Sequence, residues 1–406
     1  MKHVFLITKL KTTNIGNEAL STEIMQLFKE QQDRIKLFVN GRPFGLDGYY
    51  PKKIVNQADP VALLDKWATK VANRIKQEPD QVFQSRLPQV SLLQTDSADF
   101  KNEGWKAKLR PLKRWLVSFL PYAGQYHARA RVLKQSDWLV YSGAGEVGDN
   151  IVFLRQLVEL RAAQLLGIQT AAVNQSVVIK TPVFQKLVGH VYGQMKKVVI
   201  RGEITRTNLI QYGVPESIIE VAPDSAIHAE PTSLKPKKGN RVAINITPRV
   251  SMTDSMMEST VRLLRELGKE IVFVTNEPYE DGKMAAIFQQ KFNVPALGPF
   301  REYHQYIEAL SECDFVISAR LHTNMLSLVS HTPIIPIEGN VFKTTELLRQ
   351  LQYPILTLDS KQDGWADRLN ETIRQIENKQ YDFNRYFTDV FPKFKKAVKK
   401  NATWIG

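Results

Sequence analysis

Arg320 and His322 are the residues whose types and spacing most strongly indicate chemistry. They lie in the segment DFVISARLHTNMLSLV, after an apolar run that predicts a buried strand at 314–318 and before a predicted helix at 321–330. A guanidinium and an imidazole are costly to bury unless an anion meets them, and the start of a helix also favours an anion. A lone histidine at such a place is more often structural, so the predicted anion site depends on the pair.

Arg201 holds a comparable position in the segment VVIRGEITRTN. It ends another apolar run that predicts a strand at 198–203, and its planar fork of donors suits a phosphate or a carboxylate. A salt bridge to Glu203 or to a neighbouring domain explains Arg201 about equally well.

Two turns carry further candidates for a substrate cleft. In TTNIGNEA, Asn14, Gly16 and Asn17 stand before a predicted helix, where an ordinary turn and cap explain them as well as ligand contact does. In VYSGAGEVGDN the glycines allow close approach of the backbone, and two carboxylates lie at the mouth of the same expected cleft. These residues are Gly143, Glu146 and Asp149. Glu146 is the candidate general base for a hydroxyl, and a glycine-rich helix entrance without a catalytic role is the alternative.

Several kinds of site are not indicated by the sequence. The dinucleotide fingerprint G-x-G-x-x-G, the P-loop pattern and G-x-S-x-G are missing, and the seven histidines show no metal-ligand spacing. We therefore expect neither a metal nor a redox cofactor.

The elements that position these residues alternate between apolar strands and amphipathic helices. This alternation predicts an α/β protein with two doubly wound units on parallel sheets, in which ligands bind outside the carboxyl ends of the strands. The expected boundaries follow: residues 1–200 form an N-terminal domain with an irregular insertion at 41–127, residues 201–378 form a C-terminal domain, and residues 379–406 form a basic tail.

The chain of 406 residues has a formal charge of +14, much of it in the segments 105–134 and 391–400. Lysines and arginines interleaved with aromatic residues there suit an anionic lipid surface, while solvated helix faces are the plain alternative and nucleic acid is the least favoured partner. No apolar run is long enough to predict a transmembrane helix. The single cysteine, Cys313, favours a reducing cytoplasm.

Taken in order, these motifs resemble the polysaccharide pyruvyl transferase family from about residue 4 to about residue 350, with 41–127 unmatched. The matching segments are NIGNEA, SGAGEVGDN, RGEIT, PDSAI and SARLHTNMLSLVSHTP, followed by Lys343 in EGNVFKTTELL. The resemblance implies an α/β fold of two Rossmann-like, doubly wound domains facing across a cleft, similar to GT-B glycosyltransferases. It also implies transfer of the pyruvyl group of phosphoenolpyruvate to a sugar diol as a cyclic ketal.

The roles that follow from this resemblance are expectations. Arg201, Arg320, His322 and Lys343 would hold phosphoenolpyruvate, and His322, poised near neutral pH, would protonate its methylene carbon. The N-terminal domain would be the acceptor side and the C-terminal domain the donor side. The acceptor would be a polysaccharide unit, often lipid-linked, so the enzyme would be cytoplasmic and peripheral at the inner face of the cell membrane.

Two other classes of function compete with this one. Glu338 and Glu346 have the E-x7-E spacing found in some nucleotide-sugar glycosyltransferases of the same fold, although a glycine-rich context is mostly absent. A non-catalytic surface-binding protein would use the basic segments, but it would not need arginine and histidine in one cleft.

Overall fold

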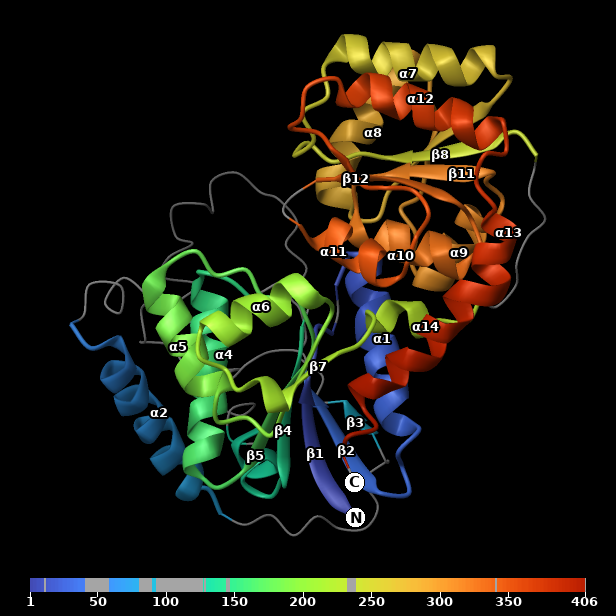
Figure 1. The fold of residues 1–406 in the computed structure, drawn as a ribbon. Helices are drawn as coiled ribbons and strands as arrows, with labels where there is room; N and C mark the ends of the chain where they lie inside the picture. Colours follow the sequence, from blue (N-terminus) through green and yellow to red (C-terminus); the bar gives the residue numbers. More distant parts are fainter. Residues whose placement is uncertain are drawn as a thin grey trace, which may run out of the picture.

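The computed structural model describes residues 1–10, 12–40, 58–79, 90–92, 127, 129–143, 147–231, 239–339 and 342–405. Within them the chain forms two α/β units, each built on a parallel sheet with helices on both faces (Figure 1). The predicted fold class is confirmed. The predicted insertion at 41–127 falls largely outside the described residues.

The first unit has a seven-stranded parallel sheet in the order β3-β2-β1-β4-β5-β6-β7. Its strands are β1 (Lys2–Ile7), β2 (Ile35–Asn40), β3 (Val90–Leu92), β4 (Trp138–Ser142), β5 (Gln169–Gln175), β6 (Lys197–Ile200) and β7 (Ile219–Val221). Its helices are α1 (Ile15–Lys29), α2 (Pro60–Lys76), α4 (Ile151–Leu165), α5 (Pro182–Tyr192) and α6 (Glu203–Gln211). The central strands are buried on both faces, which explains their nearly continuous apolar runs.

The second unit has a six-stranded parallel sheet in the order β10-β9-β8-β11-β12-β13. Its strands are β8 (Arg241–Asn245), β9 (Glu270–Val274), β10 (Ala296–Leu297), β11 (Phe315–Ser318), β12 (Ile334–Glu338) and β13 (Leu358–Asp359). Its helices are α7 (Asp254–Glu266), α8 (Pro278–Phe292), α9 (Tyr303–Ser311), α10 (Leu321–Val329), α11 (Lys343–Gln350) and α12 (Trp365–Glu377).

The first unit extends beyond the predicted boundary at residue 200. The short strand β7 pairs with β6, with Val198 opposite Ile219, and it closes one edge of the first sheet. Its three residues are only partly buried, so the apolar signal in the sequence is weak there. The chain then passes through a short 3-10 helix, η4 (Ser225–His228), before the second unit begins.

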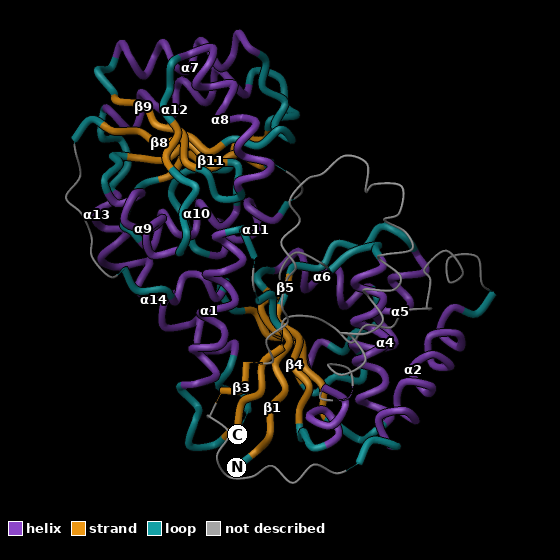
Figure 2. Tube along the Cα trace, turned by 180° about the vertical axis from the view of Figure 1, so that it is seen from behind, coloured by secondary structure: helices purple, strands orange, loops and turns teal. Residues whose placement is uncertain are grey.

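Helix α1 joins the two units into one core. One apolar cluster contains residues of β1 and α1 together with residues of α9 and α10. The Ile15 amide donates to the Asn276 carbonyl (3.0 Å), and the Tyr303 hydroxyl donates to Glu23 (2.6 Å). Figure 2 shows α1 between the two sheets. The start of α1 is therefore held against the second unit.

Residues 383–401 form helices, and residues 402–405 follow them as a turn, which corrects the prediction of a basic tail. The helices are α13 (Phe383–Arg385), the π-helical turn η5 (Tyr386–Val390), α14 (Phe391–Ala397) and the 3-10 turn η6 (Val398–Asn401). The segment returns to the first unit (Figure 1). There the Trp404 ring packs edge-on against Trp138 at 5.0 Å and Phe28 at 6.4 Å. The apolar residues of this segment belong to the core cluster, and the high charge of the segment hid this packing in the sequence.

Three lysines of this segment also pair with acidic residues of other segments. Their nitrogens lie 2.8 to 3.4 Å from carboxylate oxygens, in the pairs Lys395–Glu230, Lys399–Glu30 and Lys400–Glu220. These lysines therefore have anionic partners within the protein, and membrane contact is not needed to explain them. The other basic segment, 105–134, lies mostly outside the described residues. In the part of the chain that the structure describes, no helix is long and apolar enough to cross a membrane.

We predict that Trp404→Ala lowers the free energy of unfolding by about 2–3 kcal/mol, because it removes a large aromatic contact between the C-terminal helices and the first unit. Urea unfolding followed by circular dichroism measures this change. Thr403→Ala, at an exposed neighbouring position, is the matched control. An unchanged midpoint for Trp404→Ala would mean that the segment is a dispensable tail.

Candidate functional site

A buried ion pair stands where the two units meet. Arg201, directly after β6, places its Nη1 2.5 Å from Oδ2 of Asp224, and its Nε donates to the Ser176 hydroxyl (3.0 Å). Asp224 is fully buried and lies in the segment PDSAI. Burial alone would raise the pKa of Asp224, but the charges of Arg201 and His322 hold it below its usual range. Asp224 is therefore the anion of Arg201, a role that the sequence prediction missed although it had singled out the segment.

His322 comes from the second unit and faces this pair. Its Nε2 lies 3.8 Å from Oδ2 of Asp224 and, within the described residues, has no hydrogen-bond partner. Burial lowers the pKa of His322 to about 4; Asp224 opposes this effect, and the charges of Arg201 and Lys343 add to it. The imidazole is therefore neutral at pH 7. The expectation that it is poised near neutral pH is wrong for this structure.

Gly16 is at the site because His322 needs the space. A Cβ on Gly16 would lie 2.2 Å from Cβ of His322 and 2.5 Å from its Nδ1, so only glycine fits there. Asn14 caps α1 by accepting from the amide of Asn17 (3.0 Å). The predicted turn thus does reach the site, and it does so by packing against the imidazole.

Lys343, the first residue of α11, adds a second titratable cation. Burial lowers the pKa of Lys343 to about 8, and the positive charges of Arg201 and Arg249 add to this effect against Glu346 and Glu338. No hydrogen bond or ion pair joins its ammonium to another described residue. A lysine in this state is protonated at pH 7, and no carboxylate of the described residues forms an ion pair with it.

Glu346 joins the two units beside Lys343. Its carboxylate accepts from the amide (2.7 Å) and the hydroxyl (3.1 Å) of Thr205, at the start of α6. A Cβ on Gly202 would lie 2.2 Å from Cγ of Glu346, so Gly202 makes room for this contact. Burial raises the pKa of Glu346, and the Thr205 donors oppose it only in part. The contact fixes α11, which carries Lys343, against the start of α6, which follows Arg201.

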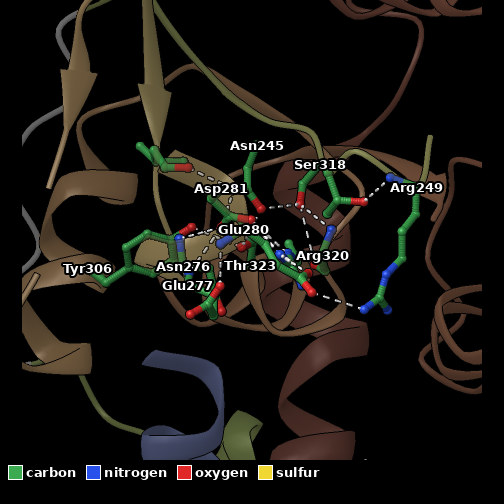
Figure 3. A network of polar contacts seen from close by, with 12 residues as sticks. Asn245, Arg249, Asn276, Glu277, Glu280, Asp281, Tyr306, Ser318, Arg320 and Thr323 are labelled. Atoms are coloured by element: carbon green, nitrogen blue, oxygen red, sulfur yellow. Dashed lines mark hydrogen bonds and ion pairs between the residues drawn. The ribbon is translucent and has the colours of Figure 1, made fainter. Parts of the chain in front are cut away.

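Arg320 already has anions within its own unit, which corrects the premise that an external anion must meet it. Its Nε and Nη2 donate to Asp281 at 2.9 and 2.6 Å, and Nη2 also donates to Glu280 at 2.9 Å. Asp281 also accepts from the Asn245 side chain and from two backbone amides (Figure 3). Arg320 therefore ties α10 to β8 and α8.

The glycine-rich turn after β4 is only partly described. A Cβ on Gly143 would lie 2.5 Å from the Asn174 carbonyl, so this glycine permits close packing of β4 against β5. Asp149 accepts from the amides of Lys180 and Thr181 and shapes the turn before α5. Its predicted place at the cleft is thus accounted for by a structural contact. Glu146 lies outside the described residues.

The E-x7-E glutamates are also occupied by protein groups. Glu338 accepts from the amide (3.0 Å) and the hydroxyl (2.9 Å) of Thr345, and Glu346 binds Thr205. Both carboxylates thus already bind protein groups, so neither is placed as a partner for the ribose of a nucleotide sugar. Across the described ranges, no group of three or more histidine, cysteine, aspartate or glutamate side chains could hold a metal.

Comparison with known proteins separates family from fold. A family model described as polysaccharide pyruvyl transferase matches residues 14–340. No curated protein sequence matches the chain.

Solved structures with a similar fold include enzymes that act on nucleotide sugars. A putative UDP-N-acetylglucosamine 2-epimerase from Listeria monocytogenes has a TM-score of 0.56 at 9% identity, over 98% of this chain and 94% of that chain. UDP-GlcNAc 2-epimerase from Methanocaldococcus jannaschii has 0.51 at 12%, over 98% and 99%. Medicago truncatula UGT71G1 complexed with UDP-glucose has 0.51 at 11%, over 100% and 98%. At these identities the likeness shows the fold alone, two Rossmann-like domains of the GT-B kind.

We predict that Gly16→Ala destabilises the protein by about 1–3 kcal/mol, since the added methyl group must displace the His322 ring or the start of α1. Thermal unfolding measures the loss. Gly282→Ala is the matched control because a Cβ there meets nothing within 4 Å, and within α8 it should stabilise by about 0.5–1 kcal/mol. Equal behaviour of the two variants would contradict the packing described for His322.

Proposed function

The chain belongs to the polysaccharide pyruvyl transferase family, and we propose that it moves the pyruvyl group of phosphoenolpyruvate onto two hydroxyls of a saccharide unit, releasing phosphate. One observation carries the proposal. Lys343 makes no hydrogen bond or ion pair with another described residue and stands in the field of Arg201 and Arg249, at the junction of the two units. This cationic corner, formed by Arg201 and Lys343 beside His322, suits a small ligand with several negative charges.

Phosphoenolpyruvate has a phosphate and a carboxylate, and the corner offers a donor for each. Lys343 supplies a point charge, and Arg201 keeps its Nη2, which has no hydrogen-bond partner among the described residues, while Asp224 holds Nη1. Arg320 has its own carboxylates, so we assign it a supporting role rather than that of a free anion clamp.

Binding of the donor would also prepare the acid. A negative charge about 4 Å from the imidazole contributes about 4 kcal/mol at an effective dielectric constant of about 20. That interaction would bring the pKa of His322 back toward neutral, so the imidazole would take up a proton as the anion binds. His322 remains the proposed proton donor, but only in the complex.

The reaction then balances without a further reagent. The His322 imidazolium protonates the methylene carbon, and one sugar hydroxyl attacks C2 of the donor. The bond from C2 to the phosphate oxygen breaks, and the second hydroxyl closes the ketal. Of the two hydroxyl protons, one restores the imidazolium and the other leaves with phosphate. Glu146 remains a predicted base for the first hydroxyl.

The site draws on both halves of the chain. Arg201 and Asp224 follow strands of the first unit, and His322 and Lys343 belong to the second. The division into an acceptor half and a donor half therefore stays a proposal, as do a lipid-linked acceptor, contact with an anionic membrane and a position at the inner membrane face.

We expect phosphoenolpyruvate, but not UDP, to raise the melting temperature of the wild-type protein, since the corner lacks a ribose-binding carboxylate. Acceptor-dependent release of phosphate should fall about 100- to 10,000-fold in His322→Ala, because the proton donor is lost. A colorimetric phosphate assay with p-nitrophenyl hexosides, and mass spectrometry for a pyruvyl mass gain, measure the reaction.

His190→Ala is the control for this experiment, because His190 lies on α5 and contacts Asp65 (2.9 Å) rather than the site. It should leave phosphate release unchanged. Stabilisation by UDP and not by phosphoenolpyruvate would instead favour a nucleotide-sugar glycosyltransferase. Full turnover in His322→Ala would remove the acid assignment.

A pH dependence follows from Lys343, whose pKa of about 8 the bound anion would raise. Affinity for phosphoenolpyruvate should therefore fall as the pH rises above about 8, by up to about tenfold per pH unit. Lys343→Met should bind weakly at pH 7 and lose this alkaline fall, whereas Lys70→Met, an exposed control on α2, should keep both. Isothermal titration calorimetry from about pH 6 to about pH 9.5 measures the affinity for phosphoenolpyruvate. An unchanged alkaline fall of the affinity in Lys343→Met would contradict the assignment.

A further inference from the structure

A pocket of about 340 Å³ lies beside the cationic corner and is built from both units. The turn between β1 and α1 forms one wall, with Thr13, Asn14 and Asn17. The start of α8 forms the other wall, with Tyr279, and Arg249 and Arg320 also contribute. Its volume is at the lower end of the roughly 300–1,000 Å³ of small-molecule sites, enough for a sugar unit.

The pocket adjoins the proposed proton donor. Gly16, which packs against His322, lies between the pocket residues Asn14 and Asn17 on the same turn. Lys9 lines the pocket and also contributes to the electrostatic environment of His322. A ligand in the pocket would therefore contact the same turn that packs against the imidazole.

The arginines of the pocket are neutralised by its carboxylates. Glu280 accepts from Arg320 at 2.9 Å and from Arg249 at 3.2 Å, and Asp281 accepts from Nε and Nη2 of Arg320 (Figure 3). Glu277 accepts from the amide of Glu280 at 2.6 Å as the cap of α8. These pairs leave little net charge for an anion, in contrast with the corner around Lys343.

Apart from the remaining guanidinium N–H groups of Arg249 and Arg320, two uncommitted polar groups of the pocket are neutral. Among the described residues, the carboxamide of Asn17 and the hydroxyl of Thr13 have no hydrogen-bond partner, although both line the pocket. An amide and a hydroxyl each donate and accept, which matches the hydroxyl groups of a sugar.

Tyr279 adds an aromatic face at the pocket. It stands in the first turn of α8 and is 77% exposed, and it is the one aromatic side chain among the exposed large hydrophobic residues of the described chain. Lys283 lies over its ring at 5.3 Å from the centroid. Exposure of such a ring has a cost, and an amphipathic ligand with an apolar face would offset it.

We propose that this pocket binds the acceptor saccharide, with a sugar ring stacked on Tyr279 and hydroxyls bonded to Asn17 and Thr13. The inference rests on the proposed function, since it places the acceptor of that reaction. The charge of the two sites assigns their ligands: the neutral polyhydroxyl compound goes to the neutral pocket, and the anionic donor to the cationic corner. The acceptor hydroxyls then lie beside His322.

The test uses p-nitrophenyl glucoside, galactoside, mannoside and N-acetylglucosaminide as probes, at up to about 10 mM, above ordinary KM values. We expect Tyr279→Ala to weaken hexoside binding, and to raise the hexoside KM, about tenfold, while affinity for phosphoenolpyruvate is unchanged. Tyr279→Phe should keep most of the binding because it keeps the ring. Asn17→Ala should weaken the hexosides and spare the donor.

Leu356→Ala is the matched control, because Leu356 is 78% exposed and does not line the pocket. Saturation-transfer NMR measures hexoside binding without turnover, and calorimetry measures phosphoenolpyruvate. Unchanged hexoside binding in Tyr279→Ala, or binding by none of the four hexosides to the wild type, overturns the pocket assignment. Tyr279-dependent hexoside binding without any binding of phosphoenolpyruvate supports the pocket and overturns the proposed function instead.

Discussion

The buried ion pair between Arg201 and Asp224 is the interaction on which the site depends. Asp224 uses one oxygen to hold Arg201 and the other to accept from the Ala226 amide, so the carboxylate fixes both the end of β6 and the start of η4. It also faces His322 from the second unit. Loss of either partner would leave an uncompensated buried charge, which typically costs about 3–5 kcal/mol. Burial of the imidazole beside this pair lowers its pKa, and the charge of Asp224 opposes that shift only in part.

The second unit likewise pairs an arginine with a buried aspartate. Asp281 pairs with Arg320 and accepts further bonds from Asn245 and two backbone amides, which fixes the carboxyl ends of β8 and β9. Both arginines are thus largely neutralised before any ligand arrives. The charge left to a ligand is that of Lys343 and, once protonated, His322. The arginines shape the site, and the titratable residues Lys343 and His322 are the groups proposed to act on the ligand.

The junction of the two units therefore contains two sites of different charge, the corner around Lys343 and the neutral pocket. Helix α1 contributes to both, since Gly16 receives the imidazole while Asn17 faces the neutral pocket. The Glu346 contact with Thr205 and the packing of Trp404 hold the units together around α1. A rigid junction suits a reaction in which donor and acceptor must be aligned, because orientation supplies much of the rate.

The sequence by itself determined the fold class, the expected family and the position of the polar residues at strand ends, because apolar periodicity and short ordered motifs are local properties. It located Arg201, Arg320, His322, Lys343 and the turn with Gly16. Only the tertiary structure decided which anion each cation meets, since Asp224 and Asp281 are 23 and 39 residues from their arginines. It also decided that residues 383–401 pack as helices and that the pKa of His322 falls to about 4. Burial and long-range pairing set these properties, and neither can be read from neighbouring residues.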